Sequence, residues 1–170
     1  MIIGLQDSRF WREGKFMNTF FRKAMQILIY NGADVDYAEK CVRDFNSPSD
    51  ELLNKIYSGL LLHCIDSLNK WAEIDKRDEI EAKLNMEISP FMDASKLVKC
   101  LTPANLSVRE SPDGEIGWQA EFDCLWEPEK GIEIVVLGGE LLYLGSFCDN
   151  SPWDEFPADD MSNYVNRICK

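Results

Sequence analysis

The side chains able to do chemistry in this sequence are mostly carboxylates. The chain of 170 residues contains 30 Asp and Glu residues but a single His. Glu127 and Glu129 flank Pro128, a spacing at which two carboxylates could act as an acid–base pair. Such a pair needs burial to separate its two pKa values, whereas this turn keeps both groups in water. We therefore expect no catalytic residue here, and a Glu127 side chain that accepts backbone N–H groups of its own turn.

His63 is the one side chain of the sequence suited to proton transfer near neutral pH. It shares a helical line with Leu60 and Ser67, within an apolar stripe. A nucleophilic mechanism would need a Ser or Cys partner that the sequence does not identify. We therefore expect a hydrogen-bonded core or boundary histidine.

The six cysteines predict neither a metal site nor a disulfide framework. They lie far apart, without any C-x-x-C pair, at Cys41, Cys64, Cys100, Cys124, Cys148 and Cys169. Zinc sites need clustered Cys and His ligands, so we expect reduced thiols and no metal. Gly138-Gly139 is not followed by Lys-Ser/Thr, and no G-x-S-x-G segment occurs, so no phosphate loop, hydrolase elbow or cofactor is predicted.

The net charge of −12 is large for this length. It repels nucleic acid phosphates and anionic lipid, so neither is an expected partner. It would attract a basic protein and speed that encounter, although the same charge can simply keep a protein in solution. The first residues lack a basic segment followed by an apolar run, and no run approaches the ~20 apolar residues of a membrane span. We therefore expect a cytoplasmic protein.

Residues 115–154 predict a three-stranded antiparallel meander, around which the rest of the chain is organised. Apolar residues alternate with polar or small ones over residues 116–124, the period of a half-buried strand. Residues 126–131 form a turn, in which Trp126 is expected to be a buried anchor. A second strand covers 132–137, Gly138-Gly139 makes a tight hairpin, and a third strand covers 140–147.

Upstream, residues 16–30 are compatible with a helix or with a hairpin. Their Phe, Ile and Tyr content favours a hairpin, with Arg22 and Lys23 at its turn. A further strand is predicted at 105–109. A final short helix is predicted at 161–168.

Two longer helices are predicted between the hairpin and that further strand. The first covers about 35–46, with Asp34 as its N-cap. The second covers about 48–73, with Ser47 as its cap and Pro48 in its first position. Since strands and helices both present one apolar face, the fold class is α+β: an antiparallel sheet, made of the hairpin and the C-terminal meander, with two main helices packed on one face. We expect a single domain over residues 1–170.

Residues 37–41 and 46–50, together with three segments of the C-terminal half, resemble an uncharacterised bacterial domain family. Residues 122–133 read F-D-C-L-W-E-P-E-K-G-I-E, against a C-x-W-E-x-E-H-G-L segment in the family. A Leu142-Tyr143-Leu144-Gly145 strand and Ser151-Pro152-Trp153 follow. The resemblance covers about residues 25–153 and supports the hairpin at 16–30. Lys130 stands where the family usually has His, and Leu125 where Asp is frequent, so any catalytic or metal role of that His is missing.

Members of this type resemble immunity proteins encoded beside secreted bacterial toxins. The resemblance implies a protein that neutralises a cognate toxin by direct stoichiometric binding, and the negative charge of this chain favours a basic one. Two alternatives stay open: a small enzyme that uses carboxylates in a pocket beside the meander, and a housekeeping interaction module.

The partner surface is predicted on the C-terminal segment, where acids surround aromatic residues. Asp149, Asp154, Glu155 and Trp153 are its candidates, and Glu127 and Glu129 are candidates on the meander turn. Trp153 could instead pin the segment to the sheet. The resemblance favours this role because S-P-W looks like a fold feature of the family, so the acids are the stronger candidates for contact.

Overall fold

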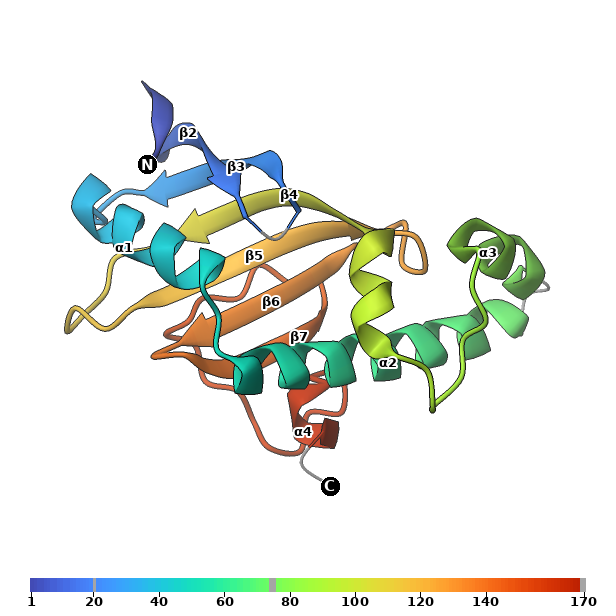
Figure 1. Ribbon diagram of the computed structural model, residues 1–170. Helices are drawn as coiled ribbons and strands as arrows, with labels where there is room; N and C mark the ends of the chain where they lie inside the picture. The colour runs from blue at the N-terminus through green and yellow to red at the C-terminus, as the bar shows by residue number, and fades with distance from the viewer. Residues whose placement is uncertain (20, 74–75, 169–170) are drawn as a thin grey trace.

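The protein is built on one seven-stranded sheet whose strands lie side by side in chain order (Figure 1). The structure, a computed structural model, describes residues 1–19, 21–73 and 76–168. The strands are β1 (Ile3–Asp7), β2 (Trp11–Asn18), β3 (Lys23–Tyr30), β4 (Leu101–Val108), β5 (Gly117–Cys124), β6 (Ile132–Leu137) and β7 (Glu140–Ser146). With the helices that cover this sheet, the predicted α+β class is confirmed.

All neighbouring strands are antiparallel except β3 and β4, which run parallel. A parallel pair needs a long crossover, and nearly all of the helical structure lies in this one. Its elements are α1 (Val35–Asn46), α2 (Asp50–Ala72), α3 (Arg77–Leu84) and the 3₁₀ helix η1 (Ala94–Cys100). The predicted hairpin and meander are therefore both present, but a parallel pair that the sequence did not indicate joins them.

The hairpin over residues 16–30 is confirmed, and the meander has the predicted boundaries to within a residue. In the hairpin, the buried side chains of Phe16 and Met25 are cross-strand partners, and Arg22 lies in the turn with a φ of 52°. In the meander, Gly138 and Gly139 both have positive φ, as a two-residue hairpin loop requires.

The first main helix begins where its cap predicted, and the second begins later. Asp34 accepts a hydrogen bond from the Tyr37 backbone N–H at 2.6 Å, which confirms the start of α1. The predicted Ser47 cap of the second helix is wrong. Ser47 instead ends α1, where its N–H donates to the Asp44 carbonyl, and Ser49 caps α2 by accepting from the Leu52 N–H at 3.1 Å.

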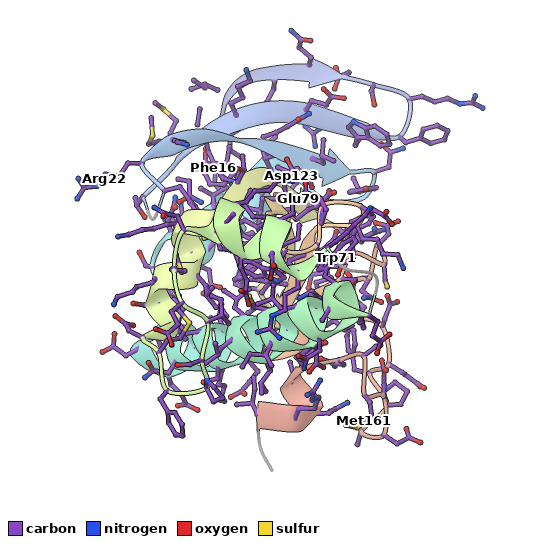
Figure 2. All side chains as sticks on the ribbon, turned by 90° about the vertical axis from the view of Figure 1, so that its right-hand side faces the viewer. Phe16, Arg22, Trp71, Glu79, Asp123 and Met161 are labelled. Atoms are coloured by element: carbon purple, nitrogen blue, oxygen red, sulfur yellow. The ribbon has the colours of Figure 1, made fainter. Side chains whose placement is uncertain are left out.

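Helices α1 and α2 pack on the same face of the sheet, as predicted (Figure 1). Side chains fill the layer between the strands and α2 (Figure 2). The layer is thin where α2 crosses β7, because Gly59 has no Cβ; a Cβ there would lie 2.9 Å from Leu144 Cδ1. Trp118 on β5 donates from Nε1 to Asp44 on α1 at 2.7 Å, so a polar contact also joins these layers.

The segment after β7 covers part of the opposite face and closes one edge of the sheet. Its Phe156 ring lies 6.0 Å from the Tyr143 ring. Asn163 then caps the outer edge of β7, since its side chain accepts from the Leu144 N–H and donates to the Leu142 carbonyl. The final helix, α4 (Val165–Ile168), is shorter than the predicted 161–168.

The Trp126 ring is fully buried, as predicted, and two hydrogen bonds join this residue to α2. Trp71 Nε1 donates to the Trp126 carbonyl at 2.9 Å, and Trp126 Nε1 donates to His63 Nδ1 at 3.0 Å. Trp126 therefore holds the meander turn against α2 through both the packing of its ring and these two hydrogen bonds.

Replacing this ring tests both contributions. Trp126→Ala should lower the free energy of unfolding by about 3–5 kcal/mol, measured by urea denaturation, because it removes a large buried side chain. Trp126→Phe keeps most of the packing but removes the indole donor to His63 Nδ1 and leaves, among the described residues, only Ser67 Oγ, 3.5 Å away, near that nitrogen, so it should cost about 1–3 kcal/mol. Equal losses in the two variants would contradict a separate contribution from the hydrogen bond.

Candidate functional site

His63 lies in the core, as predicted, with both ring nitrogens near polar groups. Nδ1 accepts from Trp126 Nε1 at 3.0 Å, and Nε2 lies 3.4 Å from Ser146 Oγ. An indole N–H can only donate, so Nδ1 must be unprotonated and Nε2 carries the proton. Burial lowers the pKa of His63 to about 4. Its acceptor nitrogen is therefore already used by the protein, and the ring fixes α2 against the meander.

The Glu127 carboxylate is half-buried and faces α2. Ser67 Oγ donates to Glu127 Oε2 at 3.3 Å. The expectation that this side chain binds N–H groups of its own turn is wrong, because α2 brings a hydroxyl to it. Within the turn, backbone atoms bond each other instead, with the Gly131 N–H donating to the Glu127 carbonyl at 2.8 Å. Glu129 is exposed on the same turn, so the two carboxylates have different surroundings.

Glu133 is the fully buried carboxylate of the meander. It accepts from the Asn150 backbone N–H at 3.0 Å, from Asn150 Nδ2 at 2.6 Å and from the Cys148 N–H at 3.3 Å. Gln119 Nε2 donates to it as well. Burial raises the pKa of Glu133, against the effect of these donors. The carboxylate thereby holds the segment after β7 on the face of the sheet opposite the helices.

A cleft opens where the start of β2, the ends of β3 and β4, and this C-terminal segment meet. It is a wide, open depression with a volume of about 660 Å³. We call it the aromatic cleft; its lining residues are Phe10, Trp11, Tyr30, Asn31, Arg109, Glu110, Asp149, Ser151 and Trp153.

The strand register brings the aromatic rings of the cleft together. Trp11 and Tyr30 are direct cross-strand partners in the hairpin, with ring centroids 5.8 Å apart. Arg109, just beyond the end of β4, places its guanidinium 4.4 Å from the centre of the Tyr30 ring. Its Nη2 also donates to Asp149 at 2.7 Å. The positive charge inside the cleft is thus paired within the protein.

Two N–H groups of the cleft residues have no acceptor. Arg109 Nε and Trp153 Nε1 are both buried and unpaired among the described residues. The Glu110 carboxylate is exposed, and no described residue bonds it. The exposed Glu110 therefore offers a carboxylate to the cleft, whereas the two unpaired donor atoms are shielded from solvent.

The structure divides the predicted partner residues into two groups. Asp149 and Trp153 line the cleft, and the exposed Asp154 and Glu155 follow directly on the same segment. Asp154 also accepts from the Ser151 N–H at 2.6 Å, which shapes the loop. Glu127 and Glu129 lie beyond the other end of β5, away from the cleft.

Sequence reasoning missed most of the lining: Phe10, Trp11, Tyr30, Asn31, Arg109, Glu110 and Ser151. A signal existed for two of them. Trp11 is out of phase with the buried Phe16 on β2, and Tyr30 is out of phase with the buried Ile29 on β3. Alternation therefore places both aromatic rings on the face away from the helices.

The described part of the chain contains no group of three or more His, Cys, Asp or Glu residues able to hold a metal ion. The five described cysteines are free, and Cys169 lies outside the described residues. No helix among the described residues is long and apolar enough to cross a membrane.

The fold and the cleft define an α+β protein with one mostly antiparallel sheet, helices on one face and an aromatic cleft at one end. A family model described as "Domain of unknown function (DUF6985)" matches residues 1–151. The chain belongs to this family, which confirms the resemblance to an uncharacterised domain family. No curated protein and no solved structure matches the chain.

The lowered pKa of His63 predicts an acid-sensitive contribution to stability. Its folded pKa of about 4 lies below the ordinary value of 6.5, so the neutral ring stabilises the fold above pH 6.5 and this stabilisation is lost as the pH falls toward 4. The difference is about 3 kcal/mol. The free energy of unfolding of the wild type should fall by that much more than that of His63→Gln between pH 7 and 4. The same pH dependence of the unfolding free energy in the wild type and in His63→Gln would contradict this prediction.

Glu133 predicts a local effect on the C-terminal segment. Glu133→Ala removes the acceptor of the Cys148 and Asn150 N–H groups, so their hydrogen exchange should accelerate by about tenfold or more. Glu121→Ala is the matched control, since Glu121 accepts only from Asn105 among the described residues. Unchanged exchange at residues 148–150 in Glu133→Ala would show that other contacts hold the segment.

Proposed function

We propose that this protein is an immunity-type binding protein that neutralises a cognate basic protein toxin by stoichiometric binding. The observation that carries the proposal is the aromatic cleft with its carboxylate border. It supplies a preformed contact surface on a protein whose net charge is −12.

The aromatic rings of the cleft suit the centre of a protein interface. Tryptophan and tyrosine are enriched among the residues that dominate binding energy, because they add large contact areas at low entropic cost. Trp11 and Tyr30 lie on paired strands, and Trp153 follows the segment that Glu133 holds. These rings are therefore ordered before a partner arrives, which reduces the entropic cost of binding.

The charges around the cleft favour a basic partner. Arg109 is paired with Asp149, and Glu110 adds an exposed negative charge that no described residue bonds, beside the positive charge of Arg9 near Phe10. The loop from β4 to β5 adds the exposed Asp113 and Glu115 at the same end of the sheet. Complementary charge speeds association and selects against acidic partners.

The enzyme alternative would need accessible carboxylates beside the meander. Glu133 is enclosed by four hydrogen-bond donors, and Glu127 is bonded to Ser67. The geometry therefore favours binding over carboxylate chemistry. A housekeeping interaction module is the remaining alternative, and a toxicity test of the partner distinguishes it from an immunity protein.

Co-expression tests the proposal. The protein that co-purifies in a 1:1 complex from the source cells would be produced alone and together with this chain. We expect it to arrest growth alone and to be harmless in the complex, with its activity restored when the complex is dissociated. A partner that is harmless alone, or one that remains active in the 1:1 complex, would overturn the proposal.

Charge reversal at the cleft tests where that partner binds. Glu110→Lys with Glu155→Lys should slow association by about tenfold or more at low salt and flatten its salt dependence, measured by stopped-flow kinetics. Asp154 is left unchanged because it holds the Ser151 N–H.

Asp123→Lys with Glu129→Lys is the control pair. It changes the net charge equally, at exposed residues toward the opposite end of β5. Both pairs should leave stability within about 0.5 kcal/mol of wild type. An equal slowing by the two pairs would mean that overall charge, and not the cleft, guides association.

A further inference from the structure

We propose that the outer edge of β1 pairs with the same edge of a second copy of this chain, so that two sheets join in antiparallel fashion across a two-fold axis. This inference is independent of the proposed function, because it concerns a different surface and a different partner.

The two edges of the sheet differ in how they are closed. At the β7 edge, Asn163 bonds the Leu144 N–H and the Leu142 carbonyl, and the Tyr164 N–H donates to the Leu144 carbonyl. At the other edge, β1 pairs with β2 alone among the described strands (Figure 1). Every residue of β1 is exposed. The N–H and C=O groups on its outer side are therefore a template for one further strand.

The composition of β1 leaves this template open. Strand edges are usually protected by proline, by lysine and other charged residues, or by a bulge. β1 has no proline and no lysine, and its one charged residue, Asp7, is its last. It does bulge between Ile3 and Gln6, where Gly4 has a φ of 68°. A Cβ at Gly4 would meet nothing within 4 Å, and glycine in a strand permits the close approach of another backbone.

Charge distinguishes a second copy from the basic partner of the proposed function. Two copies with a net charge of −12 repel each other over most of their surfaces, so they approach most readily where the surface is locally uncharged. Residues 1–6 have no charged side chain. On the adjacent strand, Glu13 and Lys15 offset each other. A basic protein gains nothing from such a neutral edge, whereas a second copy avoids repulsion there.

The side chains at this edge also suit a contact between two copies. Ile3 is 58 % exposed and Leu5 is 40 % exposed, so pairing removes apolar surface from water. An antiparallel strand edge is self-complementary, as a two-fold interface requires. Because β1 has only five residues, the contact area is small, and we expect a dissociation constant on the order of 100 µM.

Sedimentation velocity of the whole chain, from about 5 to about 500 µM, tests the pairing. Reducing conditions exclude a disulfide through the exposed Cys148. The mass should rise with concentration from 19.6 kDa toward twice that value. Because salt screens the repulsion between the copies, the dissociation constant should fall about threefold or more between about 50 and about 500 mM NaCl. Binding of a basic partner would weaken over the same range.

A lysine at the edge tests the site. Ile3→Lys brings two positive charges together across the paired strands and should raise the dissociation constant about tenfold or more. Met161→Lys is the matched control, since Met161 is 55 % exposed on the segment after β7. Both substitutions reduce the net negative charge equally, so a general effect of charge would strengthen association in both. Both variants should keep the circular dichroism spectrum of the wild type.

Amide hydrogen exchange locates the contact. The amides of residues 3–7 that face away from β2 should exchange about fivefold or more slowly at high than at low protein concentration. A chain that stays monomeric to about 500 µM, a dimer without this protection, or equal dissociation constants for the two lysine variants would overturn the inference. Protection of these amides only in a complex with another protein would also overturn it, and would assign the edge to that protein.

Discussion

The hydrogen bond from Trp126 Nε1 to His63 Nδ1 is the contact on which the two layers of this protein depend. It joins the turn of the meander to the middle of the longest helix, inside an apolar core. A buried indole N–H needs an acceptor and a buried neutral imidazole offers one, so each group satisfies the other. The Trp71 indole adds a second link to the same turn, by donating to the Trp126 carbonyl. Slippage of α2 along the sheet would therefore leave buried polar groups unpaired, a penalty that apolar packing alone does not impose.

A second buried polar group organises the opposite face. Glu133 has four donors around one carboxylate, and three of them come from Cys148 and Asn150, far along the chain. Desolvation makes a buried carboxylate costly, so this arrangement is stable only while the C-terminal segment stays in place. Trp153 follows that segment by a few residues. The wall of the cleft is therefore positioned by a buried carboxylate together with the packing of Pro152 and Trp153 against Gly117.

The single crossover explains why the cleft lies on the open face. Helices α1 and α2 lie in the connection between β3 and β4 and pack on one side of the sheet. The other face is left to polar strand residues and to the C-terminal segment, which covers β5 to β7. At the boundary of that cover, the rings of Trp11, Tyr30 and Trp153 meet the Arg109 guanidinium. A binding surface at this position can contact a partner without disturbing the core.

The sequence alone determined the local elements of this protein, because their causes are local. Alternation of apolar residues indicated the first strand of the meander, and the Phe, Ile and Tyr content of residues 16–30 favoured the hairpin. Asp34 marked the start of α1, and Trp126 was recognised as a buried anchor. The cap of α2 was misplaced because Ser47 and Ser49 are both suitable, and the choice depends on where α1 ends.

Only the tertiary structure decided the parallel pairing of β3 with β4 and the composition of the cleft. Trp11, Tyr30, Arg109 and Trp153 are separated by up to 142 positions in the sequence, and no periodicity links them. They meet because strand order and register place their positions on one face at one end of the sheet. The hydrogen-bond donors to Glu133 and Glu127 could not be predicted from the sequence for the same reason. A hydrogen bond between distant segments depends on how the layers pack, and that packing is a property of the whole chain.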